Sequence, residues 1–409
     1  MPGRSPSPTH DAHPPIPGLL PLRGVVRRYD WGSHTFLAGL RSQPEPSVEP
    51  EAELWFGAHP SAPSMVRLGD RELPLDELIA ERAGDLLGAE SVHAGAELPF
   101  LLKILAADLP LSIQLHPDAE RAGAGFEREE GEGIAREARH RLYPDANPKP
   151  EIACALTPFH ALQGLRPPAE ARDLLAALGC PEASALLELG DHAEPAALLA
   201  AVLALDGEEA RAFATAVAAA ARRVATREAA WVVRLEETYP DDPLIVAPLL
   251  LRLVELAPGE ALYTPPGVIH SYLGGAVVEL MGSSDNVLRA GLTSKHKDRD
   301  ELLAALDGAP RDPRILHPRA LAGSAWREYP ETGPLRLSFA DVDPAAPVVV
   351  EAAAGPCVLL ALAGDVVARS ADGTVVRLLP GDGALVPASA PACRLDGAGR
   401  IYRASAAAG

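Results

Sequence analysis

The sequence predicts a mainly β protein that is interrupted by an all-helical insert. After residue 240, short apolar runs alternate with Gly/Pro turns, the pattern of an antiparallel sandwich or barrel. The same pattern returns, more weakly, in the last hundred residues. Between about residues 167 and 240 alanine and leucine dominate and glycine becomes rare, which favours helices. We therefore expect a disordered tail at 1–20, a central β domain at 21–167 and 241–320, a helical insert domain at 168–240, and a C-terminal β-barrel domain at 321–409.

The charge balance and the cysteines argue against several partners and compartments. The 409 residues carry a net charge of −19, from 37 basic and 56 acidic residues, so we expect neither nucleic acid nor a membrane as partner. The four cysteines fit no CxxC pattern, which is typical of reduced thiols in a cytoplasmic protein. No apolar run is long enough to span a membrane, and no signal peptide is recognisable. We expect a monomer.

The first hundred residues contain short elements and half of the tryptophans. Short strand-like pieces occur at 24–29 and 52–57, and apolar spacing predicts a helix over 75–87. Trp31 and Trp55 lie beside these strand-like pieces. They are candidates for the wall of a carbohydrate pocket, although a place in the core explains each of them equally well.

A strand-like segment, 98–116, ends in a row of polar side chains. Over its last six residues the period is two, so Ser112, Gln114 and His116 should point to one side while Leu111, Ile113 and Leu115 point to the other. Polar neighbours on one face of a strand lie roughly 6.5–7 Å apart, close enough to grip one ion. An ordinary solvent-facing row of polar residues remains the alternative.

Further polar candidates stand at the entrance of one predicted strand and within others. Three prolines between 144 and 150 forbid a helix, and Glu151 stands where they end and an apolar strand begins, beside Lys149. This placement suits a ligand or a catalytic acid, and equally a surface turn with an exposed ion pair. Further along, His270, Tyr272 and Glu279 are polar positions within apolar strands.

A polar loop at 283–295 carries two cations, Arg289 and Lys295, which suit a phosphate group. It lacks the glycine pattern of a P-loop, and a helix is expected over 298–306. The chain is also sparing with lysine and asparagine. Only four lysines occur (Lys103, Lys149, Lys295 and Lys297) and two asparagines (Asn147 and Asn286), all in or beside these polar segments. A specific reason for each is therefore expected.

Gln114, His116, Glu151 and His270 form a candidate metal set. Two imidazoles, one carboxylate and one amide oxygen suit Zn²⁺ or a similar divalent ion and leave room for water or substrate. Because these residues span more than 150 positions, spacing alone leaves the metal site and an ordinary polar network equally open.

These segments together resemble the type I phosphomannose isomerases, a zinc family on a cupin scaffold. The resemblance covers about residues 21–310 and rests on segments at 29–32, 52–55, 98–103, 110–117, 149–151 and 284–295, in the family's order. The sequence departs from the family at Pro148, Leu165 and Gly282, which puts the fine fit of the substrate in doubt, not the activity. The resemblance implies cupin-type double-stranded β-helix (jelly-roll) barrels, a helical domain and one zinc ion bound by Gln114, His116, Glu151 and His270.

The resemblance also implies the reaction: interconversion of mannose 6-phosphate and fructose 6-phosphate through a cis-enediol, as part of mannose metabolism. Arg289 stands at the family's catalytic arginine, and Glu279 and Lys149 are our candidates for the base. The expected substrate contacts are Ser112, Lys103, Lys295, Tyr272, Trp31 and Glu53. Two alternatives remain at this point: a cupin oxygenase with Fe²⁺ in the same site, and a sugar-phosphate-binding or scaffold protein without turnover.

Overall fold

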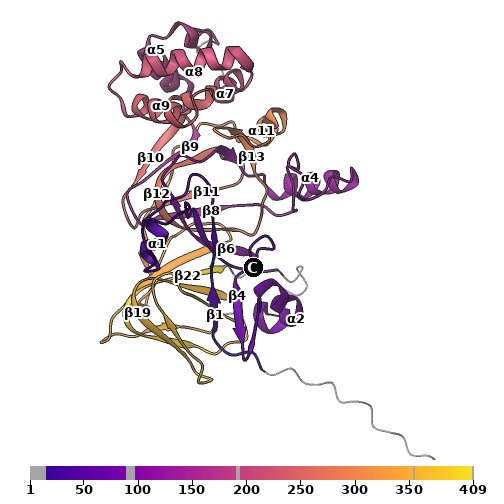
Figure 1. Ribbon diagram of the computed structural model, residues 1–409, viewed down its shortest axis with the longest axis vertical. Coiled ribbons are helices and arrows are strands. Elements are labelled where there is room, and N and C mark those ends of the chain that lie inside the picture. Colours follow the sequence, from indigo (N-terminus) through magenta and orange to yellow (C-terminus); the bar gives the residue numbers. More distant parts are fainter. Residues whose placement is uncertain (1–14, 89–96, 190–193, 353–354, 408–409) are drawn as a thin grey trace, which may run out of the picture.

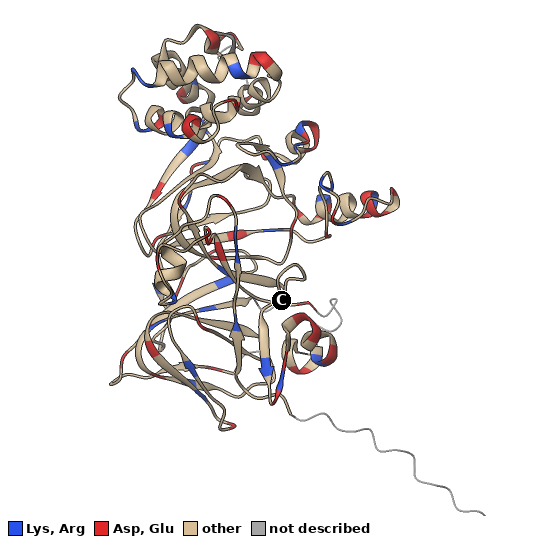
Figure 2. Cartoon of the chain, viewed as in Figure 1, with Lys and Arg blue, Asp and Glu red and all other residues tan. Residues whose placement is uncertain are grey.

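The computed structural model describes residues 15–88, 97–189, 194–352 and 355–407. Its elements form three regions along one long axis (Figure 1): a helical region at one end, a β region in the middle, and a second β region at the other end. None of the helices in the described ranges is long and apolar enough to cross a membrane. Acidic and basic residues both occur in all three regions (Figure 2).

The central region is one 11-stranded antiparallel sheet system. Seven strands follow one another in the order β14-β11-β8-β12-β6-β3-β2, and four more attach to them. Their bounds are β2 Val25–Arg27, β3 Glu53–Phe56, β6 Phe100–Ala107, β7 Ile113–Leu115, β8 Glu151–Ala155, β9 Phe159–Leu165, β10 Leu251–Leu256, β11 Ala261–Thr264, β12 His270–Gly282, β13 Leu288–Gly291 and β14 Ile315–Leu316.

The long strand β12 belongs to two layers. Its first residues pair with β7 and β9, and the residues from Gly275 onward pair with β6 and β8. A strand that is shared in this way closes two sheets around one interior, the arrangement of a jelly-roll barrel. The predicted mainly β, cupin-type fold with a helical insert is confirmed.

The helical region covers the predicted insert and continues to Leu250. It contains α5 Pro168–Leu178, η1 Pro181–Ala183, α6 Ser184–Leu187, α7 Pro195–Leu203, α8 Gly207–Ala221, α9 Arg227–Thr238, η2 Pro243–Val246 and α10 Ala247–Leu250. One apolar cluster joins these helices to the barrel, since it includes Ile113 and Leu115 of β7 as well as Phe213 and Trp231 of the helices. Outside this region, the described residues form the helices α1 Phe36–Leu40, α2 Leu75–Leu87, α4 Ala119–Gly131 and α11 Arg299–Ala305.

The second β region combines both ends of the chain. Its strand order is β15-β16-β17-β22-β19-β21-β1-β4-β5, with β18 and β20 attached. The bounds are β1 Leu20–Arg23, β4 Met65–Leu68, β5 Arg71–Pro74, β15 Arg319–Ala320, β16 Arg327–Glu328, β17 Leu335–Val342, β18 Val348–Val350, β19 Cys357–Ser370, β20 Val375–Leu378, β21 Gly383–Val386 and β22 Cys393–Ala406. This sheet therefore extends beyond residues 321–409, and the domain boundaries stay a prediction.

The predicted tail at 1–20 is described only from residue 15 onward. Leu19 and Leu20 are buried, and β1 begins at Leu20, where it pairs with Leu385 of β21. The final part of the predicted tail is therefore ordered by strand pairing.

Two predicted breaks are wrong, and glycine explains both. The sequence pattern separates strands around Gly274-Gly275 and at Gly364, but β12 and β19 run straight through these positions. Gly275 has φ +106° and a Cβ there would lie 2.5 Å from the Pro158 carbonyl oxygen, while Gly364 has φ +82°. Each glycine bends a continuous strand where no side chain fits, and does not end it.

Replacing Gly275 with alanine should therefore destabilise the fold. We expect the free energy of unfolding to fall by about 1–3 kcal/mol, because alanine is strained at this φ and would meet backbone. Urea unfolding measures the change. As a control, Gly123→Ala within α4 has open space around the added methyl group and should raise stability by about 0.5–1 kcal/mol. Equal stability of the Gly275 variant and the parent would contradict this account of the bend.

Candidate metal centre

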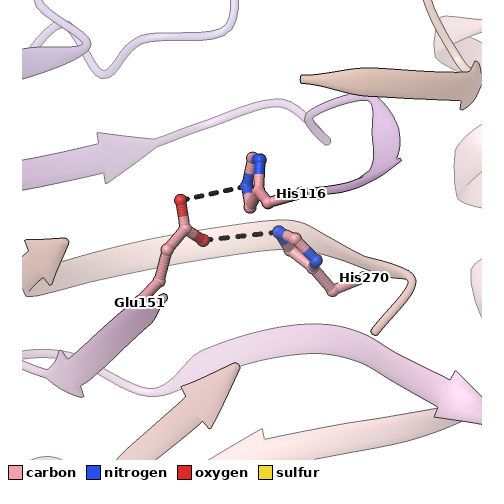
Figure 3. Close-up of side chains that lie close together, drawn as sticks. All are labelled: His116, Glu151 and His270. Atoms are coloured by element: carbon pink, nitrogen blue, oxygen red, sulfur yellow. Dashed lines mark ion pairs between the residues drawn. The ribbon is translucent and has the colours of Figure 1, made fainter. Parts of the chain in front are cut away.

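Three buried residues from separate strands meet inside the central barrel. His116 follows β7 directly, Glu151 is the first residue of β8, and His270 is the first residue of β12. Their ligand atoms lie within 4.8 Å of one another, and each residue is at most 2% exposed. Figure 3 shows both imidazoles on one side of Glu151, each facing one of its carboxylate oxygens. We call this set the histidine–carboxylate cluster.

The hydrogen bonds of the two histidines fix where their protons are. His116 Nδ1 lies 2.7 Å from the Asn286 carbonyl oxygen, and His270 Nδ1 lies 2.9 Å from the Val268 carbonyl oxygen. A carbonyl oxygen can only accept, so each Nδ1 carries a proton and donates it. Burial lowers the pKa of His116 to about 4, which keeps this ring neutral near pH 7. In a neutral ring protonated at Nδ1, Nε2 presents a lone pair.

The Nε2 atoms of both histidines face the carboxylate oxygens of Glu151, which are acceptors as well. His116 Nε2 lies 3.1 Å and His270 Nε2 3.3 Å from the two oxygens of Glu151, and neither nitrogen has a hydrogen-bond donor. Although burial opposes ionisation, the positive charge of Lys149 holds the pKa of Glu151 well below its usual range, so it is a carboxylate. Buried acceptors that converge without a donor are costly unless a cation lies between them. The donor set, two imidazoles and one carboxylate, is one that catalytic zinc sites use.

Gln114 lies next to this cluster. It is the direct partner of His270 in the β7–β12 pairing and of Arg289 in the β7–β13 pairing. Residues that are directly opposite in antiparallel strands point their side chains to the same face, with Cβ atoms about 4.5–5.5 Å apart. The Gln114 amide oxygen accepts a hydrogen bond from Ser112 at 2.9 Å. Its role as a metal ligand stays a prediction.

Lys149 contacts the cluster directly. Its Nζ lies 2.9 Å from Glu151 Oε1, and the residue is 8% exposed. The lysine therefore serves as a hydrogen-bond donor to a cluster residue. The exposed ion pair that was the alternative for this segment is excluded, because both partners are buried.

A second buried group, which we call the carboxylate–lysine cluster, consists of Glu53, Lys103 and Glu279. In the register of β3, β6 and β12, Trp55, Lys103 and Glu279 are directly opposite one another and share a face. Lys103 Nζ lies 3.4 Å from Glu53 and 3.6 Å from Glu279. Burial alone would lower the pKa of Lys103, but the two carboxylates raise it above its ordinary value.

Glu279 is the one residue of this group that is poised to exchange a proton near neutral pH. Burial, reinforced by the negative charge of Glu151, raises the pKa of Glu279 to about 7 against the opposing effect of Lys103. Tyr272 connects the two clusters, because its hydroxyl donates to Glu151 at 3.4 Å and also interacts with Glu279. Burial raises the pKa of Tyr272, so the hydroxyl keeps its proton.

Two cations lie at the edge of the site. Arg289 has no ion-pair or side-chain hydrogen-bond partner within the described ranges, and burial lowers its pKa. Burial, followed by the nearby charge of Arg289, also lowers the pKa of Lys295, whose Nζ lies 5.8 Å from the centre of the Tyr29 ring. Arg289 also lines a cavity of about 670 Å³ between barrel and helical region, shared with Arg211 and Lys297. No residue of the histidine–carboxylate cluster lines this cavity.

The predicted aromatic residues are partly core and partly surface. Trp55 is 5% exposed, donates from Nε1 to Glu53 at 2.9 Å, and lies 4.6 Å below Lys103 Nζ. Trp31 stacks on Tyr29 with ring centres 5.5 Å apart, and both rings are partly exposed. Trp31 is therefore available to a ligand, while Trp55 supports the carboxylate–lysine cluster.

The polar row of residues 112–116 is only partly a strand. The predicted strand-like segment 98–116 is two strands, β6 and β7, and Leu111, Ser112 and His116 lie outside β7. Ser112 donates to Gln114 Oε1 at 2.9 Å, so these two side chains lie together as predicted, while Leu111 packs beside a different apolar cluster from Ile113 and Leu115.

Sequence reasoning missed two contacts near the site. His59 is 4% exposed, and its Nε2 lies 3.4 Å from Asp285 of the loop that carries Arg289. The Asn286 carbonyl that holds His116 was also missed. A backbone acceptor leaves no signal in a sequence, and nothing in the spacing of His59 points to a partner 226 positions away.

Comparisons with known proteins point to one family. The family model for the catalytic domain of type I phosphomannose isomerase matches residues 19–168. The mannose-6-phosphate isomerase of Salmonella typhimurium is 35% identical over 390 residues, covering 93% of this chain and 98% of that protein. The human mannose-6-phosphate isomerase is 33% identical over 324 residues, covering 72% and 74%.

Solved structures agree over nearly the whole length. The crystal structure of mannose 6-phosphate isomerase from Salmonella typhimurium, bound to fructose 6-phosphate and zinc, superposes with a TM-score of 0.88 at 32% identity. The superposition covers 96% of this chain and all of that one. A zinc-bound mannose 6-phosphate isomerase structure matches with the same score, identity and coverage.

Proposed function

This chain belongs to the type I mannose-6-phosphate isomerases, and from that premise we propose how its residues interconvert mannose 6-phosphate and fructose 6-phosphate. The protein is a zinc-dependent aldose–ketose isomerase. We propose that His116, Glu151 and His270 hold one zinc ion per chain, with Gln114 as a fourth ligand. The observation that carries this proposal is the pair of buried Nε2 lone pairs that face both oxygens of Glu151 without a donor.

A zinc ion bound there would polarise the sugar oxygens at C1 and C2 as a Lewis acid. The chain's own residues then need to move one proton between C2 and C1 and to hold the charge that develops on oxygen. The open-chain aldose loses its C2 proton to a base and becomes a cis-enediolate with the charge on O1. A proton then passes from O2 to O1, which moves the charge to O2. When the base returns its proton to C1, the C2–O2 bond becomes the carbonyl of the ketose.

We assign the base to Glu279. Its carboxylate has a pKa of about 7, so at neutral pH it can both accept and return a proton, whereas Lys149 already donates to Glu151. Lys149 then has a different task, which is to donate a hydrogen bond to the oxygen that becomes negative beside Glu151. Tyr272 can donate in the same way.

Arg289 and Lys295 supply positive charge at the edge of the site. Two neighbouring cations that have no described carboxylate bonded to them suit an anion with several oxygens. We propose that Lys295 binds the phosphate with Ser112 and that Arg289 stabilises the enediolate or orients the sugar hydroxyls. Lys103 and Glu53 already neutralise each other, and we assign them to hydroxyl groups of the sugar. Trp31 is assigned to an apolar wall of the substrate site.

Activity should depend on the ionisation of Glu279. The base works as the carboxylate, so below a pKa of about 7 the active fraction falls roughly tenfold per pH unit and above it the rate levels off. A pH–rate profile of kcat/KM for the zinc-loaded enzyme measures this acidic limb. The limb should be lost, together with most of the rate, in Glu279→Gln.

The control for this prediction is Glu51→Gln. Glu51 is equally buried but pairs with Arg41 outside both clusters. Glu51→Gln should leave the pH profile of kcat/KM almost unchanged. If Glu279→Gln kept both the rate and the acidic limb, another residue would be the base.

The function is tested by a coupled assay of mannose 6-phosphate conversion before and after chelation. Turnover should disappear with the metal and return with added zinc. Turnover that is insensitive to chelation would contradict the metal-dependent reaction. Binding of the sugar phosphate without turnover would favour the non-catalytic alternative, and activity that needs iron and oxygen would favour the oxygenase.

We also propose that the enzyme acts as a cytoplasmic monomer. The four cysteines are unpaired and buried, which supports a reducing compartment. Sedimentation equilibrium at micromolar concentration tests the monomer, and a stable dimer would contradict it.

A further inference from the structure

Both asparagines of the chain lie in one buried contact between two loops. The first loop, residues 143–149, precedes Glu151, and the second, residues 283–287, precedes Arg289. Asp145 and Asn147 of the first loop meet Ser284 and Asn286 of the second. We call these four residues the asparagine clasp.

Asn286 forms the centre of the clasp. Its side-chain Nδ2 donates to the Asp145 carbonyl at 2.8 Å, to Asp145 Oδ1 at 3.2 Å and to the Asn147 carbonyl at 2.9 Å. Its Oδ1 accepts from the Asp145 amide at 3.4 Å. The residue is 0% exposed, so water cannot replace these bonds.

Further bonds make the contact rigid. Asp145 Oδ2 accepts from the Asp285 amide at 2.8 Å, and the Ser284 hydroxyl donates to the Asn147 carbonyl at 3.1 Å. The Asn147 side chain donates to the Ser283 carbonyl at 3.2 Å. Each loop therefore satisfies polar backbone groups of the other.

The clasp acts on the reaction centre from both loops. The Asn286 carbonyl accepts the Nδ1 proton of His116 at 2.7 Å, which orients the ring and places its Nε2 lone pair toward Glu151. The side chain of the same residue holds the loop that ends in Lys149, whose Nζ lies 2.9 Å from Glu151. The backbone of Asn286 thus sets the tautomer of His116, and its side chain fixes the course of the loop that leads to Lys149.

We propose that Asn286 is a positioning residue that couples the metal-binding face of His116 to the placement of Lys149 and Glu151. This inference rests on the proposed zinc site and adds a residue that does not itself touch metal or substrate. Asparagine suits the position because one planar group supplies two donors and one acceptor. Aspartate has no such donors and would set a second carboxylate against Asp145.

The test replaces Asn286 with alanine and measures zinc affinity by competition with a chromophoric chelator, without any substrate. Alanine keeps the Asn286 carbonyl but removes the side-chain bonds that hold this carbonyl against His116 Nδ1. We expect the dissociation constant for zinc to rise about 10–100-fold, the usual effect of disturbing a partner that orients a metal ligand. In the zinc-saturated variant, kcat should fall about 10-fold or more while KM changes less than about threefold, because Lys149 is displaced and the phosphate contacts remain. Asn286→Asp should weaken zinc binding further.

The matched control is Asn147→Ala. It removes one side-chain bond of the same clasp but keeps every bond of the Asn286 side chain, so the carbonyl that holds His116 stays in place and the zinc affinity should stay within about threefold of the parent. If Asn286→Ala does not fold, Asp145→Asn is the replacement variant. This variant keeps the shape of the clasp, but its NH₂ group replaces the oxygen that accepts from the Asp285 amide, so two donors would face each other. It should weaken zinc binding about 3–10-fold.

Two results would overturn the inference. One is an Asn286→Ala protein with a lower melting temperature in the metal-free state but unchanged zinc affinity, which would make the clasp merely structural. The other is an equal loss of affinity in Asn147→Ala. If instead the parent bound zinc but did not isomerise mannose 6-phosphate, the proposed function would fail, while the affinity difference would still test the clasp.

Discussion

Replacing Glu151 with glutamine should remove zinc from the protein and reduce kcat/KM at least about 10³-fold, equivalent to about 4 kcal/mol of transition-state stabilisation. The two carboxylate oxygens of Glu151 face both histidine Nε2 atoms, and its negative charge is also the partner of Lys149. Glutamine keeps the shape but offers one neutral oxygen and an NH₂ group, which would point donors at one imidazole and leave a buried ammonium unpaired.

Elemental analysis after dialysis and the coupled isomerase assay measure the two effects. Glu255→Gln is the control, because Glu255 of β10 is half-exposed and forms an ion pair with Arg227 at the start of α9. It should retain one zinc ion and parental activity. A Glu151→Gln protein that is folded by circular dichroism and keeps stoichiometric zinc would show that the ion is held elsewhere.

Replacing Arg289 with alanine should lower kcat by about 10²–10³-fold while leaving zinc content and folding stability almost unchanged. The arginine has no ion-pair or side-chain hydrogen-bond partner in the described part of the chain, so its removal leaves no described carboxylate unpaired. Keeping a guanidinium partly buried with no anion bonded to it destabilises the free protein. Charge-assisted hydrogen bonds to an oxyanion or a phosphate offset this cost when the substrate binds.

Lysine should rescue Arg289 poorly, because an ammonium lacks the planar pair of donors that can grip two oxygens at once. Arg211→Ala is the matched control, since Arg211 lines the same cavity from the helical region and is exposed. Steady-state kinetics of the three variants separate the roles. If the two alanine variants lost activity equally, the general positive charge of the cavity, and not the position of Arg289, would be responsible.

Local patterns predicted the regular elements well. The apolar spacing at 75–87 gave the bounds of α2, and the alanine- and leucine-rich composition of 167–240 predicted the helical region that contains α8. Such elements depend on side chains a few positions apart, which a sequence displays directly. The sequence could not predict that β12 continues across Gly274-Gly275, because glycine is equally typical of a turn and of a bend within a strand. The neighbouring carbonyl of Pro158, which leaves no room for a side chain at Gly275, is visible only in the structure.

The same division applies to the site. Residue chemistry selected His116, Glu151 and His270, and the structure brings all three together. Composition also singled out Asn286 and the four lysines, but it did not say what they contact. The assignment of Glu279 over Lys149 depends on burial and on the charges of Glu151 and Lys103, which come from other strands.

The sequence by itself determined the kinds of atoms available: two imidazoles, a carboxylate, scarce lysines, and the apolar periods that make strands and helices. Only the tertiary structure decided which of them meet, which tautomer each histidine adopts and which carboxylate has a pKa near neutrality. The physical reason is that tautomers and pKa values depend on distances, burial and backbone carbonyls. In this barrel, the carbonyl that fixes the tautomer of His116 and the lysine opposite Glu279 come from residues more than a hundred positions away in the chain.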